Sequence, residues 1–214
     1  MKNPKIDPAE KIILLGASRG LGQAVAQGLQ QLNLDVSCFS RSSLEAMDFS
    51  KEAEWPNFID RLVKLNPDRL FYFAGGGPHG DYSKKEWKDH LWSLRVTFLF
   101  PAFLLSQIAK FSSLRQLVFV GSAIAESDPD PQAASYAAGK AALKNLLLSI
   151  HAEQKSAHLD LRLFSPGYMD TGLLPANAWP RRQPDLVKAP SSVADAFIEW
   201  VQSSDDTQRH FVLR

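Results

Sequence analysis

The sequence predicts an α/β fold in which helices cover both faces of a doubly wound parallel sheet, in three layers (α/β/α). Three observations predict it. Short apolar runs alternate along the chain with longer segments of helical periodicity. The apolar runs alternate little with polar residues, as expected of parallel strands that are buried on both faces. The length of 214 residues fits one domain, which we expect to span residues 1–214.

The first part of the chain follows the strand–helix alternation closely. The apolar run Lys11–Leu15 is expected to be a buried strand because it stops at a glycine. Gly20–Leu32 has a helical pattern, and Asp35–Ser40 is expected to be the second strand. A second helix is expected over Trp55–Leu65, where the Asn66-Pro67 pair closes it.

The middle of the chain continues with the strand Arg69–Phe73, which ends at consecutive glycines. Ser83, with Glu86 three residues later, has the spacing of a capping box. We therefore expect a long helix over Ser83–Phe111. The apolar run Gln116–Val120 is expected to be the next strand.

The last part of the chain repeats the alternation around a long loop. A helix is expected over Ser135–Gln154 and a strand over Leu159–Phe164. A loop with several Pro and Trp residues runs over Ser165–Pro190. A final helix, capped by Ser191 or Ser192, is expected to reach Gln202, and a short strand follows over His210–Leu213. In such sheets, ligands bind beyond the carboxyl ends of the strands.

Composition excludes several functional classes. The chain has 24 Lys plus Arg and 23 Asp plus Glu, a net charge of +1, so we expect neither nucleic acid nor a membrane surface as a partner. The five His residues show no metal-ligand spacing, and the single Cys38 fits a reducing compartment, so we expect no metal and a cytoplasmic location. Met1–Glu10 lacks the apolar run of a secretory signal. Val96–Leu105 is half the roughly 20 residues of a membrane helix.

A glycine-rich turn, Gly16-Ala-Ser-Arg-Gly-Leu-Gly22, joins the first strand to the first helix. Glycines let a pyrophosphate approach the amino end of a helix, where free N–H groups favour anions. A plain strand-to-helix connection is the alternative interpretation. Arg19 lies in the turn, and Arg41 follows the second strand, where NAD-binding folds commonly place an acid. An arginine there suits a 2′-phosphate, so NADP(H) is favoured over NAD(H), unless Arg41 is simply a solvated side chain.

A second pattern combines Ser122, directly beyond a strand, with Tyr136 and Lys140 on the following helix. Positions i and i+4 share one face of a helix. A nearby ammonium favours the phenolate and lowers the pKa of a tyrosine, which then serves as a proton donor or acceptor. By itself a Tyr-xxx-Lys pair is more often a solvated helix face.

Taken together, these motifs resemble the short-chain dehydrogenase/reductase family. The matching residues are Gly16–Gly22, Ala74-Gly75, Ser122, Tyr136-xxx-Lys140 and Pro166-Gly167-xxx-Thr171. The resemblance covers residues from about 11 to 201 and implies a single NAD(P)-binding domain of Rossmann type. In this family Tyr136 would be the acid/base, Ser122 would orient the substrate oxygen, and Lys140 would bind the nicotinamide ribose.

The resemblance also implies the cofactor-binding residues. Those that would contact the cofactor are Gly16, Ser18, Arg19, Gly20, Leu21, Gly22, Arg41, Asp48, Ala74, Gly75, Tyr136, Lys140, Pro166, Gly167 and Thr171. Asp48 would contact the adenine amino group, and Thr171 would hold the nicotinamide carboxamide. Members of the family often form dimers or tetramers through their two long helices, so we expect a homodimer or homotetramer.

Two departures from the family pattern stand out. Arg95 occupies the place of the family's fourth catalytic residue, an asparagine. Either the helix bends differently, or Arg95 points at the substrate, or catalysis is impaired, or Arg95 is a structural residue paired with an acid. Only Ser42–Ala46 separates Arg41 from the Met47-Asp48 segment, too few residues for the helix usual there, so the chain is a short variant lacking that helix.

The expected function is an NADP(H)-dependent oxidoreductase that transfers hydride between the nicotinamide and a small-molecule carbonyl or alcohol. A non-catalytic NADP(H)-binding sensor or scaffold on the same fold is the alternative, which Arg95 keeps open. We expect residues 172–190 to form a lid over the substrate, with Arg181 and Arg182 either solvated or binding an anionic substrate. Trp87 and Trp92 are expected to be packing or interface residues.

Overall fold

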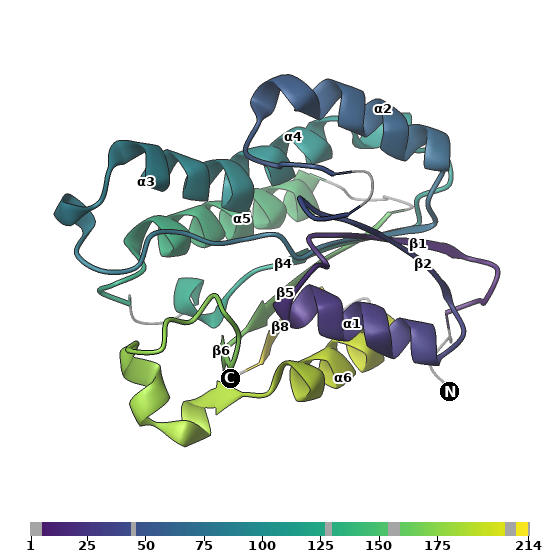
Figure 1. Ribbon diagram of the computed structural model, residues 1–214. Helices are drawn as coiled ribbons and strands as arrows, with labels where there is room; N and C mark the ends of the chain where they lie inside the picture. Colours follow the sequence, from purple (N-terminus) through teal and green to yellow (C-terminus); the bar gives the residue numbers. More distant parts are fainter. Residues whose placement is uncertain (1–5, 44–45, 127–129, 154–158, 204–208, 214) are drawn as a thin grey trace.

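The computed structural model describes residues 6–43, 46–126, 130–153, 159–203 and 209–213, and it contains one parallel sheet between two layers of helices (Figure 1). The sheet order is β2-β1-β3-β4-β5-β8, and every neighbouring pair is parallel. The strands are β1 (Lys11–Leu15), β2 (Asp35–Phe39), β3 (Arg69–Tyr72), β4 (Gln116–Val120), β5 (Asp160–Pro166) and β8 (His210–Leu213). This confirms the predicted Rossmann-type fold.

Helices cover both faces of this sheet (Figure 1). On one face lie α1 (Gly20–Gln31) and α6 (Pro190–Val201), which pack on each other, and Gly28 of α1 permits this because a Cβ there would lie 2.5 Å from Ile198 Cδ1. The other face carries α2 (Trp55–Leu65), α3 (Trp87–Leu94), α4 (Phe100–Ser106) and α5 (Ala134–Glu153). Alternate residues of a strand point to opposite faces of the sheet, and a hydrophobic core lies on each face. In β1, Ile13 and Leu15 pack in one core, and Ile12 and Leu14 pack in the other.

Short elements complete the chain. The two-stranded sheet is β6 (Tyr168–Met169) with β7 (Val187–Lys188). The 3₁₀ turns are η1 (Glu52–Glu54), η2 (Tyr82–Lys84), η4 (Ile108–Lys110), η5 (Ala123–Ala125), η6 (Trp179–Arg182) and η7 (Pro184–Leu186). Among the residues described between β2 and η1 there is no helix, as predicted for a short variant. No helix of the described ranges is long and apolar enough to cross a membrane.

The expected long helix over Ser83–Phe111 is wrong in its start and its continuity. Ser83 lies in η2, and Lys85 has extended backbone, so the helix begins only at Trp87 with Glu86 as its N-cap. After α3 the chain forms a π-helix, η3 (Arg95–Leu99), before α4. Pro101 near the start of α4 has no N–H to give to a carbonyl of the preceding turn, and the wider π turn accommodates that gap.

The predicted serine cap of the last helix is also wrong. Pro190 is the first residue of α6 and Ala189 is its N-cap. Proline is favoured at this position because its fixed φ suits a helix and its missing N–H would have no partner there. Ser192 lies one turn inside, where its hydroxyl donates to the Ala189 carbonyl at 2.9 Å.

Candidate active site

A pocket of about 550 Å³ opens where the strand order reverses. The strands β2 and β3 lie on opposite sides of β1, and the loops that leave the carboxyl ends of these strands therefore diverge and leave a crevice. Residues that follow β1, β2, β3, β4 and β5 all line this pocket. Its position at the switch point is where a doubly wound sheet binds ligands.

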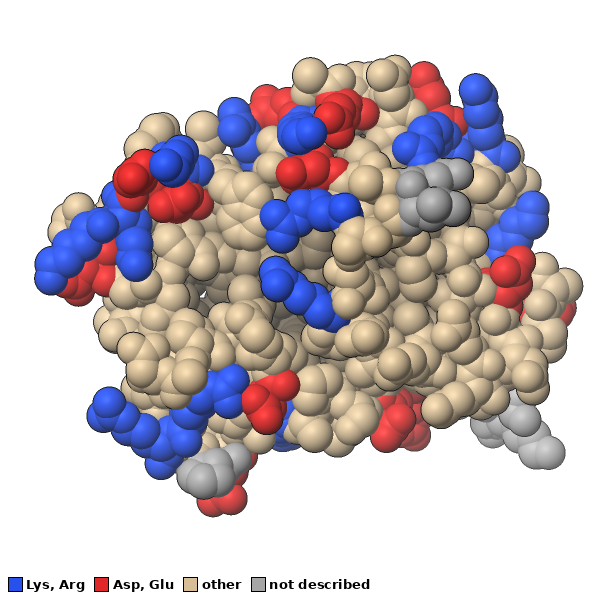
Figure 2. Space-filling view, viewed as in Figure 1, with Lys and Arg blue, Asp and Glu red and all other residues tan. Residues whose placement is uncertain are grey.

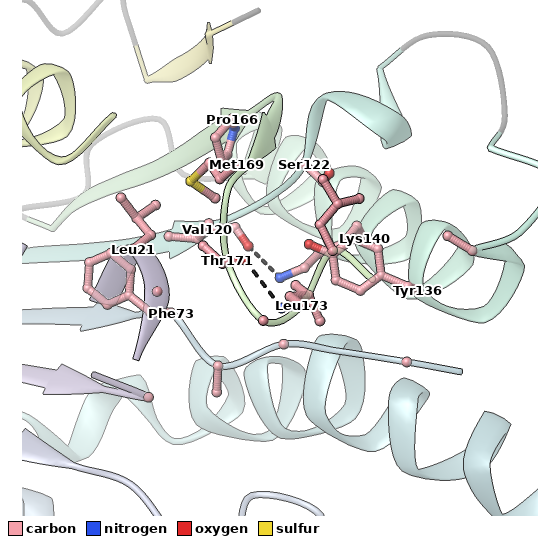
Figure 3. A pocket seen from close by; sticks show the side chains of 18 of the residues that line it. Leu21, Phe73, Val120, Ser122, Tyr136, Lys140, Pro166, Met169, Thr171 and Leu173 are labelled. Atoms are coloured by element: carbon pink, nitrogen blue, oxygen red, sulfur yellow. Dashed lines mark hydrogen bonds between the residues drawn. The ribbon is translucent and has the colours of Figure 1, made fainter. Parts of the chain in front are cut away.

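The pocket brings together the residues that the sequence predicted for cofactor binding. Its lining includes Gly16, Ser18, Arg19, Gly20, Leu21, Gly22, Arg41, Asp48, Ala74, Gly75, Tyr136, Lys140, Pro166, Gly167 and Thr171. Ser122 also lines it. Figure 3 shows Ser122, Tyr136 and Lys140 on one side of the cavity, with Thr171 and Leu173 on the loop that crosses it.

The glycine-rich turn is shaped by close backbone contacts. Gly16 has φ of 88°, and a Cβ there would lie 2.5 Å from the backbone nitrogen of Ala74. A Cβ at Gly22 would lie 2.6 Å from the Gly16 carbonyl oxygen. Arg19 is the N-cap of α1 and its side chain makes no capping hydrogen bond, and the first turn holds no acidic residue. The amino end of α1 is thus available to an anion.

Positive charge lines the pocket at this turn. Arg19 and Arg41 are both exposed lining residues. Figure 2 shows Lys and Arg side chains at the rim of a hollow on the viewed face. The Arg41 guanidinium lies 5.8 Å from the ring centroid of Trp92, which belongs to α3. The two arginines therefore follow separate strands, β1 and β2, and line the same pocket.

Asp48 lies beside these arginines. Burial raises the pKa of its carboxyl, but the hydrogen bonds from Ser50 and the charge of Arg41 outweigh that effect and lower it. The Ser50 hydroxyl donates to Asp48 Oδ1 at 2.7 Å, and the Ser50 N–H donates to the same atom at 3.0 Å. The second oxygen, Oδ2, accepts no hydrogen bond within the described chain, so it remains available as an acceptor.

Lys140 and Tyr136 lie next to each other, beside the glycine loop that follows β3, at residues 75–77. The buried Lys140 Nζ donates to the Val120 carbonyl at 2.6 Å (Figure 3) and lies 5.6 Å from the centroid of the Tyr136 ring. A Cβ at Gly75 would lie 3.2 Å from Lys140 Nζ, so glycine there keeps the access to both groups open. An ammonium has three donors, and the described residues provide an acceptor for one of them.

Burial acts on both groups. It raises the pKa of the Tyr136 phenol to about 12, against a smaller lowering by a hydrogen bond with Ser122. It lowers the pKa of Lys140 to about 7. The lowering of the tyrosine pKa that a neighbouring ammonium was expected to cause is therefore outweighed by burial, because the ammonium is turned toward Val120 and is itself desolvated.

Arg95 is not among the residues that line the pocket in the described structure. Its Nε donates to Glu52 Oε1 at 2.7 Å, which ties the π-helix to η1. Of the roles that the sequence left open, this placement fits a structural arginine paired with an acid. A π turn begins at Arg95 itself, so the helical hydrogen bonding changes at this residue.

The loop expected to be a lid is held together by Arg181. Its guanidinium donates to Asp170 Oδ1 at 2.7 Å, to the Thr171 carbonyl at 3.3 Å, and to the Leu174 and Pro175 carbonyls at 2.9 and 3.0 Å. These contacts leave Arg181 little capacity for an anionic substrate, one of the roles the sequence had left open.

Sequence reasoning missed several lining residues. Asp130 and Tyr168 line the pocket and bond to each other, and Trp92 is a lining residue as well as a packing one. The spacing of Trp92 and Val96, four apart on a helical pattern, was the available signal that both share the pocket face. No comparable signal pointed to Asp130, which lies in a loop without periodicity.

Comparisons with known proteins agree with this geometry. No protein-family model matches the sequence. A curated relative, sepiapterin reductase of Bos taurus, is 26% identical, and the match covers 83% of this chain and 79% of that protein. An identity of this size leaves both the activity and the substrate of the chain open.

Solved structures match almost the whole chain. A short-chain dehydrogenase from Burkholderia cenocepacia in complex with NADP has a TM-score of 0.81 at 21% identity, covering 95% of this chain and 96% of that one. BdcA in complex with NADPH gives 0.82 at 19%, covering 96% and 93%. A 4-hydroxyisoleucine dehydrogenase complexed with NADH gives 0.79 at 20%, covering 95% and 96%. These likenesses confirm the fold and the resemblance to the short-chain dehydrogenases/reductases.

Proposed function

Because the chain has the fold of the short-chain dehydrogenases/reductases, we propose that it is an NADP(H)-dependent oxidoreductase acting on a small-molecule carbonyl or alcohol. One observation carries the proposal. Ser122, Tyr136 and Lys140, which come from the end of β4 and from α5, line the same pocket as the glycine-rich turn at the amino end of α1. A proton-transfer group and an anion-binding turn thus share one cavity.

The residues of the pocket fit a dinucleotide. The uncapped amino end of α1 suits a pyrophosphate, and the glycines at 16 and 22, where a Cβ would collide with backbone, allow the tight turn that leads into this helix. The remaining donors of Lys140 suit ribose hydroxyls, and Thr171 offers a hydroxyl near them. A bound nicotinamide dinucleotide would supply the hydride.

The chain's own residues handle the proton. Tyr136 keeps its phenol protonated at neutral pH, since burial raises its pKa to about 12, and it is therefore suited to donate a proton to a carbonyl oxygen. Ser122 lines the same pocket as Tyr136 and would orient the same oxygen. Lys140, whose Nζ lies 5.6 Å from the centroid of the Tyr136 ring, would bind the cofactor ribose.

The charge at the pocket supports NADP(H) over NAD(H). Arg19 and Arg41 both line the part of the pocket next to the glycine-rich turn, and an arginine binds a phosphate with parallel hydrogen bonds. Among the similar solved structures some hold NADP or NADPH and another holds NADH, so the family resemblance alone does not select the cofactor. The two arginines are the reason for the preference.

The loop and the long helices complete the proposal. Residues 172–190 contribute Leu173, Leu174 and Trp179 to the pocket lining and would cover a bound substrate. The chain would assemble as a homodimer or homotetramer through α3 and α5. A non-catalytic sensor or scaffold is the competing function, but Arg95, which kept it open, pairs with Glu52 away from the pocket.

Replacing Tyr136 tests the function. In Tyr136→Phe we expect kcat for NADPH-dependent reduction of any carbonyl that the protein accepts to fall by at least about a hundredfold, because the proton donor is lost. Binding of NADPH, measured by fluorescence titration, should stay within about twofold. Tyr82→Phe is the matched control, since Tyr82 is half exposed and does not line the pocket in the described structure. If turnover were unchanged in Tyr136→Phe, Tyr136 would not be the proton donor. If the wild-type protein bound NADPH but reduced no carbonyl, the non-catalytic sensor would be favoured.

A further inference from the structure

Charged side chains line the pocket both within the proposed cofactor site and outside it. The Lys and Arg side chains that line it within the described structure are Arg19, Arg41 and Lys140, and each of them has a place in the proposed cofactor site. Besides Asp48, which the proposed cofactor site includes, the acids that line the pocket are Asp130 and Asp185, which belong to the loop before α5 and to η7. The pocket lining outside the proposed cofactor site therefore offers negative charge.

Asp130 is the more consequential of these two acids because it is buried. Its residue is only 7% exposed, whereas Asp185 is exposed and its charge is screened by solvent. Asp130 Oδ2 accepts a hydrogen bond from the Tyr168 hydroxyl at 2.8 Å, and Oδ1 accepts one from the Gln132 N–H at 2.9 Å. A carboxylate has about four lone-pair positions, so acceptor capacity remains.

No basic side chain pairs with Asp130 among the residues that the structure describes. A buried carboxylate without a cationic partner costs free energy, which a partner in the pocket would recover. Lys140 and Lys144, the basic residues that follow Asp130 in sequence, bond to Val120 and Glu126, and Arg181 bonds to Asp170. A cation that pairs with the Asp130 carboxylate would then belong to the molecule that the pocket binds.

A second observation concerns Trp179, which also lines the pocket. Its indole Nε1 is the buried side-chain polar atom that lacks a hydrogen-bond partner in the described part of the chain. The Trp179 ring packs edge-on against Tyr168, with ring centroids 5.5 Å apart. Tyr168 therefore connects the two groups: its hydroxyl bonds to Asp130 and its ring contacts Trp179. Aromatic rings beside a carboxylate favour a cation.

Resting on the proposed function, we propose that Asp130, Tyr168 and Trp179 form a substrate-recognition subsite. The subsite selects carbonyl compounds that carry a second, cationic or hydrogen-bond-donating nitrogen group, such as an amidine, a guanidine or an amino-substituted ring. Asp130 pairs with that group, and the Trp179 ring, packed edge-on against Tyr168, forms the wall beside it. Tyr168 positions the Asp130 carboxylate through its hydroxyl. Substrates with a carboxylate at the same place are disfavoured by repulsion from Asp130.

Three aldehydes of equal size test the subsite: para-formylbenzamidine is cationic, para-formylbenzamide is neutral, and para-formylbenzoate is anionic. With saturating NADPH we expect kcat/KM for the amidine to exceed that for the benzoate by at least about tenfold, because a buried charge pair replaces a buried repulsion. In Asp130→Asn the ratio should fall to within about twofold. Tyr168→Phe should lower it partially, since the carboxylate loses the hydroxyl that holds it.

Binding provides a measurement that needs no turnover. Calorimetric titration of the complex with NADP⁺ should show benzamidine binding more tightly than benzoate, and Asp130→Asn should abolish the difference. If no aldehyde is reduced but this preference holds, the proposed function fails and the subsite stands. Asp185→Asn is the matched control and should keep the preference, because that acid is exposed.

Three results would overturn the subsite. They are benzoate binding as well as benzamidine, neither compound binding at millimolar concentration, and a preference that survives Asp130→Asn. Should Asp130→Asn fail to fold, Tyr168→Phe decides, and an unchanged preference there overturns the proposal.

Discussion

Arg41 is the residue on which the proposed preference for NADP(H) depends most. It follows β2, lies over the Trp92 ring, and lowers the pKa of Asp48 through its charge. We predict that Arg41→Ala weakens NADPH binding about tenfold and leaves NADH binding nearly unchanged, because a charge-assisted hydrogen bond to the 2′-phosphate contributes about 1.5 kcal/mol or more. Fluorescence titration with both cofactors measures this.

The control for that titration is another arginine. Arg95→Ala removes a guanidinium that pairs with Glu52 outside the pocket, so both affinities should stay at the wild-type values. An equal loss of NADPH and NADH affinity in Arg41→Ala would show that Arg41 contacts a part common to both cofactors, and the argument for a 2′-phosphate would fall.

Site residues could be predicted from the sequence where the residues that act together are only a few positions apart. Gly16 and the Tyr136–Lys140 pair belong to spacings of a few residues, which a turn or a helix places in known relation. The pairing of Tyr168 with Asp130 joins positions that are 38 residues apart in two loops, and no periodicity relates them. The pKa of Tyr136 was expected to be lowered, because proximity in sequence indicated an ammonium nearby but could not reveal how deeply both groups are buried.

At the scale of elements, Arg181 turns the loop after β5 into one unit. From η6 it bonds to Asp170 and to the carbonyls of the segment that carries Thr171 and Leu173. We predict that Arg181→Met lowers kcat/KM about tenfold, mainly through a higher KM for substrate and NADPH, because Thr171 loses its fixed position. Steady-state kinetics with both concentrations varied will separate KM from kcat.

Two further variants make the Arg181 prediction specific. Arg181→Lys keeps one charge for Asp170 and should recover part of the loss, whereas a merely structural arginine would show the loss in thermal stability and not in KM. Arg182→Met alters the exposed neighbour, which is not a lining residue of the described pocket, and should have no effect. Kinetics unchanged in Arg181→Met would show that the loop holds its shape without the clamp.

A helix could be predicted where apolar residues keep the helical spacing along the whole segment. The bounds of α1 and α2 follow from apolar positions at helical spacing and differ from expectation by a residue at most. The long helix could not be predicted in its details. A serine and a glutamate at capping-box spacing indicate a helix start only if the intervening backbone is helical, and at Lys85 it is extended. The π turn at Arg95 changes the hydrogen-bond period, which a fixed helical spacing does not represent.

At the scale of the whole molecule, the alternation of apolar strands with helices predicted the three layers of the fold but not the order of the strands in the sheet. Parallel pairing and two covered faces follow from apolar strands separated by helices. Whether β3 joins β1 on the side away from β2 depends on the direction of a crossover connection, which the residues of the strands do not encode. The pocket could be assigned to the carboxyl ends, yet its substrate end is formed by loops whose contacts arise only after the sheet is assembled.

The assembly of several chains gives the last prediction, because the layer with α3 and α5 exposes apolar side chains. Trp87 is 63% exposed and Leu148 of α5 is 48% exposed. In a two-fold dimer through these helices the same surface patch is contributed by both protomers, so a new charge is introduced twice into one interface. We predict that Leu148→Glu converts the oligomer to monomers in light scattering coupled to gel filtration. Leu32→Glu, at the end of α1 on the opposite face and 51% exposed, should leave the mass unchanged. A wild-type protein that is monomeric at high concentration, or a Leu148→Glu variant that keeps the oligomer, would assign the exposed Trp87 and Leu148 to another role.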